Sequence, residues 1–312
     1  MRGSRVVTLP AATMRRPRTG GWWTSHQRGL VPYLFIAPNM VLFTAFSFLP
    51  LLYAVYISFH DWTLIGEPDF IGIGNYRRLV HDPLFWRALV NTLLYAAGTV
   101  PTSMAIGMVL ALALNRRVPA RVFLRSVYFL PLIVSAVATG TIAAWMFNDN
   151  YGVLNAIIVR LGGSRVSWLS SPYWALPSLM LTTLWVRVGF CMVVYLAALQ
   201  SIPRMYYEAA RIDGASALRQ FLHVTLPLLK PATFLLLVLS IIYSFRVFDL
   251  IYVMTGGGPG FSTTMLVQYI FRSAFVTAEM GYASAVGIAL YVLILGFTIL
   301  QWRTSRQAEN VM

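Results

Sequence analysis

The sequence predicts an all-α integral membrane protein whose chain crosses the bilayer six times. Hydrophobic residues make up 58% of the 312 residues and charged residues only 11%, and the mean hydropathy is +0.68. This composition excludes a soluble globular domain. The apolar runs are continuous and long enough to cross about 30 Å of hydrocarbon as helices. They lack the alternation of polar and apolar residues that is typical of a membrane β-barrel.

The chain begins with a basic segment, residues 1–29, which contains several arginines and no acidic residue. The apolar run after it is much longer than the hydrophobic part of a signal peptide, so we expect an uncleaved, disordered cytoplasmic tail. One transmembrane domain is expected over residues 30–302, and residues 303–312 form a second cytoplasmic tail. The six spans are predicted near residues 30–59, 87–114, 122–147, 173–199, 232–254 and 283–302.

The distribution of charge predicts the orientation in the membrane. There are 24 basic and 10 acidic residues. Most of the basic ones lie in the first tail, between the second and third spans, in residues 203–231 and after the last span. Because Arg and Lys gather in cytoplasmic loops, both termini and residues 203–231 are predicted to be cytoplasmic. Attraction to anionic lipid headgroups accounts for the excess of positive charge, so we do not infer nucleic-acid binding.

Residues 203–231 are polar between two apolar spans and predict two short helices joined by a hinge. Pro203 suits the first turn of a helix, where its missing N–H has no cost. Gly214 is placed to end the first helix in the left-handed conformation. Exposed apolar residues at helical spacing favour an interface over a loop that is merely solvated. These residues are Met205, Ala209 and Ile212 in the first half, and Leu218, Phe221 and Leu222 in the second.

The same segment resembles the EAA loop of binding-protein-dependent ABC importer permeases. Glu208-Ala209-Ala210 is followed by Gly214 and then by Leu226-Pro227. The resemblance implies the type I ABC importer permease fold and a coupling helix that docks into a cleft on a separate ATP-hydrolysing subunit. In this interpretation Gly214 permits the turn, Glu208 anchors the loop by charge-assisted bonds and Asp213 caps the second helix. The implied coupling residues are Tyr207, Glu208, Ala209, Ala210, Asp213, Gly214, Ala215 and Phe221.

Further segments resemble the carbohydrate-uptake branch of this family, of the maltose and glycerol-3-phosphate type. They comprise residues 70–92, 128–131, 151–155, 244–264 and 281–285. The resemblance implies that a sugar is carried into the cytoplasm by alternating access. The sugar would sit near the bilayer midplane against the fourth and fifth spans. Position by position, that site corresponds to Leu184, Val186, Arg187, Phe190, Ser240, Tyr243, Ser244 and Val247.

The hydroxyl and aromatic side chains in this set suit a sugar, since sugars are held by hydrogen bonds and by stacking on rings. Phe190 and Tyr243 are equally compatible with plain packing between helices. The amide side chains of the family are absent, and Leu184, Val186 and Val247 cannot bond a hydroxyl. Either the substrate differs or a second permease supplies most of the polar contacts.

Three charged residues fall well inside the predicted spans, away from their first turns: Arg187 in the fourth, and Arg246 and Asp249 in the fifth. A charge that faces lipid is costly, so each is expected to face the bundle interior, a water-filled path or a partner subunit. Arg246 and Asp249 are three residues apart and are predicted to pair on one helix face. This pair would serve either function or packing. Arg187 has no partner within its span, which favours a functional role.

The sequence contains no motif for catalysis. It has no phosphate-binding loop of the G-x-x-x-x-G-K-[ST] type, no nucleophile elbow and no zinc-binding helix pair. We therefore expect no enzyme activity, metal or cofactor on this chain, and a membrane-embedded enzyme is disfavoured. The remaining alternative is a proton-coupled secondary transporter without an ATPase partner, for which Asp249 is the only acidic residue within a span.

The resemblance also implies the partners. They are a second permease subunit, two ATP-binding subunits that hold ATP and Mg, and an extracytoplasmic sugar-binding lipoprotein. The expected location is a bacterial inner membrane, where the chain contacts lipid.

Overall fold

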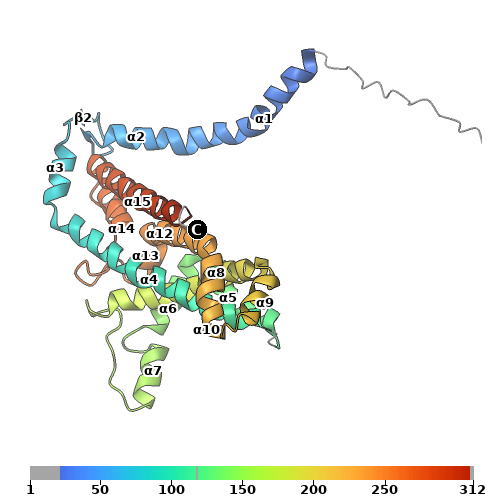
Figure 1. The fold of residues 1–312 in the computed structure, drawn as a ribbon. Coiled ribbons are helices and arrows are strands. Elements are labelled where there is room, and N and C mark those ends of the chain that lie inside the picture. Colours follow the sequence, from blue (N-terminus) through green and yellow to red (C-terminus); the bar gives the residue numbers. More distant parts are fainter. Residues whose placement is uncertain (1–21, 117–118, 310–312) are drawn as a thin grey trace, which may run out of the picture. The chain divides into compact units, whose positions relative to one another are not determined.

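A computed structural model describes residues 22–116 and 119–309, with side chains over residues 32–116 and 119–303. The prediction of an all-α protein is confirmed, because the structure is 76% helical and its described part contains a single two-stranded sheet. Most of the basic tail predicted over residues 1–29 lies outside the described residues, as do the last residues of the tail predicted over 303–312. The chain forms two units, residues 1–53 and 54–312 (Figure 1).

The first unit contains one apolar helix that is interrupted by a π-helical turn. α1 (Trp22–Phe43) continues through η1 (Thr44–Phe48) into α2 (Leu49–Ile57), whose last residues belong to the second unit. The stretch Pro32–Ile57 is long and apolar enough to cross a membrane, which agrees with the predicted first span. Prolines inside α1 are compatible with a span, since neighbours in a membrane protein re-satisfy the freed backbone groups.

The second unit starts with a short β-ribbon and a helix that lead into a helix of 33 residues. β1 (His60–Asp61) and β2 (Asp69–Phe70) pair antiparallel, and α3 (Gly74–His81) follows. α4 (Pro83–Asn115) begins at a strong start signal. Asp82 accepts a hydrogen bond from the Leu84 N–H at 2.8 Å, and Pro83 occupies the first turn. The helix therefore begins before residue 87, where the span was expected.

The predicted third span is broken rather than continuous. Over residues 122–147 the structure has α5 (Arg121–Ile133) and α6 (Ala136–Met146), bent by 99° at the break. Val134 takes extended backbone, and the Ser135 hydroxyl accepts a hydrogen bond from the Ala138 N–H at 3.2 Å. Ser135 thus caps a new helix inside an apolar run.

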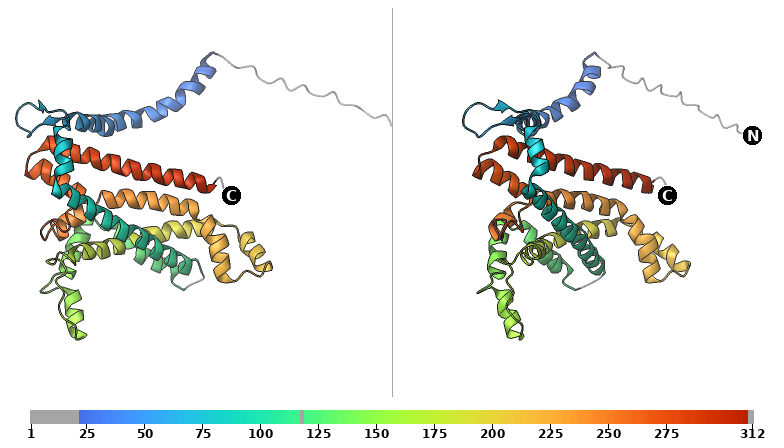
Figure 2. Two further views of the ribbon diagram at one scale, coloured as in Figure 1. Left: turned by 60° about the vertical axis from the view of Figure 1, so that its left-hand side comes forward. Right: turned by 90° about the vertical axis from the view of Figure 1, so that its left-hand side faces the viewer.

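The fourth span is confirmed as α8 (Ala175–Ser201), preceded by the short α7 (Val153–Arg160). The polar segment after it forms α9 (Arg204–Ile212), α10 (Ala217–Gln220), η2 (Phe221–Thr225) and α11 (Leu226–Leu228). Figure 2 shows α9 and α10 at the opposite end of the second unit from the β-ribbon.

The predicted fifth span is also broken. α12 (Lys230–Phe245) is bent by 62° from the preceding helices, and α13 (Asp249–Met254) begins only after three residues outside any helix. An apolar helix that the sequence analysis did not predict follows as α14 (Leu266–Phe271) and η3 (Arg272–Val276). The sixth span is confirmed as α15 (Met280–Glu309).

Three hydrophobic clusters hold these helices together. The first joins α4, α8 and α12 through residues such as Met104, Met192 and Leu236. The second joins α4 to α14 and α15, and the third joins α6, α8 and α13. α4 and α8 therefore form the centre of the second unit, and α12 and α13 pack beside them.

Candidate functional site

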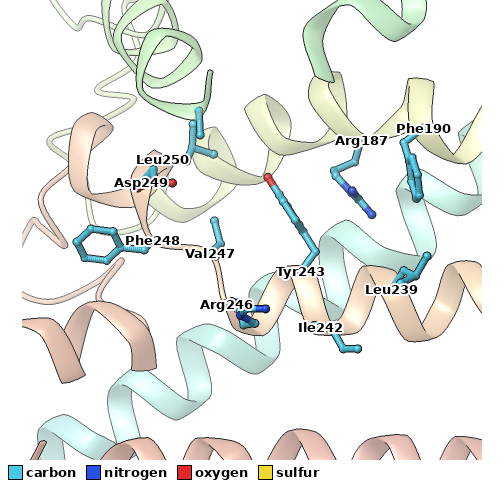
Figure 3. Close-up of a pocket in the computed structure, with 11 residues that line it drawn as sticks. Arg187, Phe190, Leu239, Ile242, Tyr243, Arg246, Val247, Phe248, Asp249 and Leu250 are labelled. Atoms are coloured by element: carbon cyan, nitrogen blue, oxygen red, sulfur yellow. The ribbon is translucent and has the colours of Figure 1, made fainter. Parts of the chain in front are cut away.

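A cavity of about 410 Å³ opens between α8, α12 and the start of α13 (Figure 3). Its wall is mainly apolar, with a small number of polar groups, as is typical of a ligand site. The polar groups are two guanidinium groups, one phenol and one carboxylate, from Arg187, Arg246, Tyr243 and Asp249. Tyr243 lies in α12, and the break after this helix adds Arg246 and Asp249 to the lining.

Four of the eight residues predicted for a sugar site line this cavity: Arg187, Phe190, Tyr243 and Val247. Ser240 and Ser244 do not, and each is 2% exposed behind the wall. The Ser240 hydroxyl accepts a hydrogen bond from Arg187 at 3.4 Å, and that of Ser244 lies 3.4 Å from the Thr99 hydroxyl.

Leu184 and Val186 lie outside the lining. Five apolar lining residues were not predicted from the sequence: Ala136, Leu239, Ile242, Phe248 and Leu250. Several of them reach the cavity only because the chain breaks before α6 and before α13.

Arg187 is the one Arg, Lys, Asp or Glu among the buried residues of the described chain, at 8% exposure. Its guanidinium carbon lies 4.6 Å from the centroid of the Phe190 ring and 4.4 Å from that of the Tyr243 ring. Figure 3 shows the two rings on opposite sides of the arginine. Cation–π attraction therefore holds the guanidinium group at the cavity wall.

The ion pair predicted between Arg246 and Asp249 is not formed. α12 ends at Phe245 with Arg246 as its C-terminal cap, whereas Asp249 is the first residue of α13. The two side chains therefore do not share one helix face. Within the described part of the chain, the only ion pair joins Arg78 to Glu279. Arg246 and Asp249 instead contribute separate charges to the same cavity.

α9 and the residues after it adopt the predicted helix–hinge–helix arrangement. Gly214 has a φ of +73°, and the Ala215 N–H donates to the Ala210 carbonyl at 2.8 Å, which is the hydrogen bond of a glycine-terminated helix end. The apolar stripe of α9 stays exposed, with Met205 at 66% and Ile212 at 86%.

The structure bears on two further residues of this segment, Asp213 and Glu208. Asp213 does not cap the second helix, because it is the C-terminal cap of α9; the Ser216 hydroxyl caps α10 by accepting from the Arg219 N–H at 3.4 Å. Glu208 is exposed and stays a predicted anchor for a partner. The Tyr207 hydroxyl lies 3.0 Å from that of Thr225, which fastens α9 to η2.

The family is decided by the match of residues 103–307 to the profile described as "Binding-protein-dependent transport system inner membrane component". The chain belongs to this family. It is a permease with the type I ABC importer fold, and its solved structural neighbours are ABC transporters.

Named relatives cover nearly the whole chain. The permease is 37% identical to the "Sulfoquinovosyl glycerol transport system permease protein SmoG" of Agrobacterium fabrum, over 96% of this chain and 100% of that protein. It is 38% identical to the "Trehalose/maltose transport system permease protein MalF" of Thermococcus litoralis, over 88% and 93%. The structure of a bacterial alginate ABC transporter, in complex with an alginate pentasaccharide-bound periplasmic protein, matches with a TM-score of 0.80 and 26% identity, over 92% and 97%.

The end of the permease that carries the β-ribbon has an electrostatic cluster of its own. Asp82, just before α4, accepts hydrogen bonds from the hydroxyls of Tyr269 and Tyr282. Arg78 donates to Glu279 at 2.7 Å and lies over the Tyr282 ring. Partial burial alone would raise the pKa of Asp82, but the two hydroxyls and the N–H groups of α4 hold it below its ordinary value. The cluster ties α3 and the start of α4 to α14 and α15.

Proposed function

We propose that this permease is the transmembrane subunit of an ATP-driven importer that carries a sugar into the cytoplasm by alternating access around the cavity. The names of its relatives support a sugar as the substrate, and the sugars in those names include a sulfonated one and neutral ones. The cavity supports the site, since it lies at the breaks and crossings of the spans and combines aromatic with polar groups. The permease itself is not an enzyme in this proposal.

The observation that carries the coupling is the exposed apolar face of α9. Met205 and Ile212 project from a short helix whose end is fixed by a left-handed glycine, between two hydrophobic spans. A loop that is merely solvated does not need an exposed apolar stripe. An exposed stripe of this kind is typical of an interface whose partner is absent. The proposed partner is a separate ATP-binding subunit that holds ATP and Mg, and residues 203–231 and both termini are then cytoplasmic.

The importer further needs a second permease subunit, a second ATP-binding subunit and an extracytoplasmic binding protein. The solved alginate transporter was crystallised with such a periplasmic protein. In this permease the β-ribbon, α3 and the cluster around Asp82 lie at the opposite end of the unit from α9, and they form the proposed docking side for the binding protein.

The test compares two isoleucines of equal exposure. Ile212→Asp changes the apolar face of α9, and Ile65→Asp changes the tip of the β-ribbon; the two side chains are 86% and 87% exposed. Each variant is purified with the ATP-binding subunits, the second permease and the binding protein. Burying a charge in place of an isoleucine opposes docking by about 2 kcal/mol or more, so Ile212→Asp is expected to lower sugar-stimulated ATP hydrolysis by at least about tenfold.

Ile65→Asp should retain the co-purified ATP-binding subunits at the wild-type level. If Ile212→Asp also retains them, and uptake keeps its wild-type rate, the coupling role of α9 is wrong. Uptake driven by a proton gradient without ATP would then establish the secondary transporter instead.

A further inference from the structure

The cavity contains a buried positive charge that the described chain does not neutralise. Arg187 is 8% exposed, and no ion pair among the described residues includes it. Of its five N–H donors, one has a hydrogen-bond partner in this part of the chain: Ser240, at 3.4 Å. Buried charges in proteins are normally paired, so the guanidinium group is built to receive a partner that the chain does not supply.

The two aromatic rings act on Arg187 rather than being free for a sugar. Each ring centroid lies within 5 Å of the guanidinium carbon, at 4.6 Å for Phe190 and 4.4 Å for Tyr243, and the rings lie on either side of it in Figure 3. The ring faces toward Arg187 are therefore occupied. The edge of the guanidinium plane remains available between the two rings. This edge carries the N–H groups and can bind a planar or tetrahedral anion in bidentate fashion.

The rest of the lining is rich in donors and poor in acceptors. Its polar groups are the guanidinium groups of Arg187 and Arg246, the Tyr243 phenol and the Asp249 carboxylate, with no amide or aliphatic hydroxyl side chain. Two charges of +1 and one of −1 give the lining a net charge of +1. A neutral sugar offers hydroxyls that donate as well as accept, and it leaves this charge in place. An acidic group offers only acceptors and cancels it.

We propose that the transported sugar carries an anionic group, a sulfonate, carboxylate or phosphate. Arg187 binds that group through its N–H edge, and Phe190 and Tyr243 hold the guanidinium plane in position. Asp249, at the other end of the cavity, accepts hydrogen bonds from hydroxyls of the same sugar. Arg187 is thus the residue by which this permease selects acidic over neutral sugars.

This inference rests on the proposed sugar import, and the test separates the two. The complete complex, with ATP-binding subunits and binding protein, is reconstituted in proteoliposomes. Uptake and ATP hydrolysis are measured with matched probes on one sugar ring: glucose, glucuronate, glucose 6-phosphate and 6-deoxy-6-sulfoglucose, with maltose and trehalose as neutral disaccharides. The wild-type complex should import one or more of the acidic probes and none of the neutral ones.

Variants then isolate the contribution of the permease, because the binding protein is the same throughout. Arg187→Gln should lower uptake of the acidic sugar by at least about tenfold, as a hydrogen bond to a charged group is lost. Arg187→Lys keeps the charge without the planar edge, so its uptake of acidic sugar should lie between those of the wild type and Arg187→Gln. Arg272→Gln is the control, since that guanidinium group lies over a single ring, Phe261, at 4.9 Å and outside this cavity.

Import of a neutral sugar by the wild-type complex would overturn the inference and leave the proposed function standing, even if Arg187→Gln fails to assemble. The inference would also be overturned if Arg187→Gln reduced the amount of second permease that co-purifies while the complexes that do assemble imported acidic sugar at the wild-type rate, because the charge would then be paired by the partner. If none of these probes or any other sugar stimulates the wild-type complex, the proposed function and this inference both fail.

Discussion

Replacing Gly189 by alanine should separate α8 from α5 at the level of the cavity. A Cβ atom at Gly189 would lie 1.9 Å from the Tyr128 carbonyl oxygen and 2.6 Å from its carbon. These are backbone atoms, so no side chain can rotate to relieve the collision. Since Cβ contacts below 3.0 Å essentially do not occur, the helices must move apart by at least the difference of 3.0 and 1.9, which is 1.1 Å.

The expected cost is at the upper end of the range for overpacking, about 3 kcal/mol. A movement of this size also displaces Arg187 and Phe190, which lie two residues and one residue from Gly189, so uptake should fall together with stability. Gly296→Ala is the matched control. Gly296 lies in α15, and apart from its own turn of helix no atom lies within 4 Å of its Cβ position, so alanine there should raise helix stability by about 0.5–1 kcal/mol.

The assay is the thermal unfolding midpoint of the purified complex, with uptake measured on the same preparations. Gly189→Ala should lower the midpoint by about 6 °C or more, whereas Gly296→Ala should leave it unchanged or raise it. A Gly189→Ala permease that unfolds at the wild-type temperature and transports normally would refute the argument that this crossing requires glycine.

Three further predictions follow from single residues. Because the folded state lowers the pKa of Asp82 from 3.8, its ionised form stabilises the fold above that pH, and this contribution is lost as pH falls through the lowered value. In Asp82→Asn, the unfolding midpoint should therefore fall less steeply with decreasing pH below about pH 4. The same pH dependence as in the wild type would contradict this. Asn155, 2% exposed, bonds the backbone of Val166 in both directions at 2.9 and 3.0 Å, so Asn155→Ala should cost about 2–4 kcal/mol in a chemical unfolding experiment, and a loss under about 1 kcal/mol would count against it. A side chain at Gly214 has open space around it but must take a φ of +73°, at a backbone cost of about 1–2 kcal/mol. Gly214→Ala should therefore lower the amount of sugar imported per ATP hydrolysed, and Gly214→Asn should lower it less. If both variants keep the wild-type ratio of sugar imported to ATP hydrolysed, the hinge has no part in the mechanism.

The parts of the fold that depend on local sequence were predictable. Long apolar runs predict helices because every backbone group in lipid must be satisfied within the segment, and the four long apolar helical stretches of the described residues agree with this. Gly214 was predictable for the same reason: a helix end in the left-handed conformation favours glycine whatever surrounds it. The exposed stripe of α9 follows from spacing alone.

The breaks within the third and fifth spans were not predictable from hydropathy. Ser135 is a single capping residue in an apolar run, and only its hydrogen bond to the Ala138 N–H shows that a helix starts there. The predicted ion pair of Arg246 requires helical spacing to Asp249, and the break between α12 and α13 removes that spacing. A charged residue inside a span is equally a signal that the helix ends, since it can cap the last carbonyl groups.

Four of the eight residues that the family resemblance implies line the cavity. The position-by-position correspondence holds only where a predicted span is one continuous helix. Arg187 and Phe190 lie on the unbroken α8, and both line the cavity. Ser240 and Ser244 face inward from α12 to α8 and α4, since the helix packs by its small residues. Phe248 and Leu250 line the cavity because α12 ends before them. A correspondence of positions with the family does not show such a break.

The position of α9 explains how one contact surface is able to act on this cavity in the proposed mechanism. Two residues, Ile202 and Pro203, separate α9 from α8, the helix that carries Arg187. On its other side, the hydrogen bond between Tyr207 and Thr225 fastens α9 to η2, which leads through α11 into α12, the helix that carries Tyr243. A movement of α9 is therefore applied to both walls at once. Arg187 and Phe190 share α8, whereas the Tyr243 ring reaches Arg187 from α12. In the proposed mechanism, a larger separation of the two helices moves the Tyr243 ring away from Arg187, and release of the anion is coupled to this displacement.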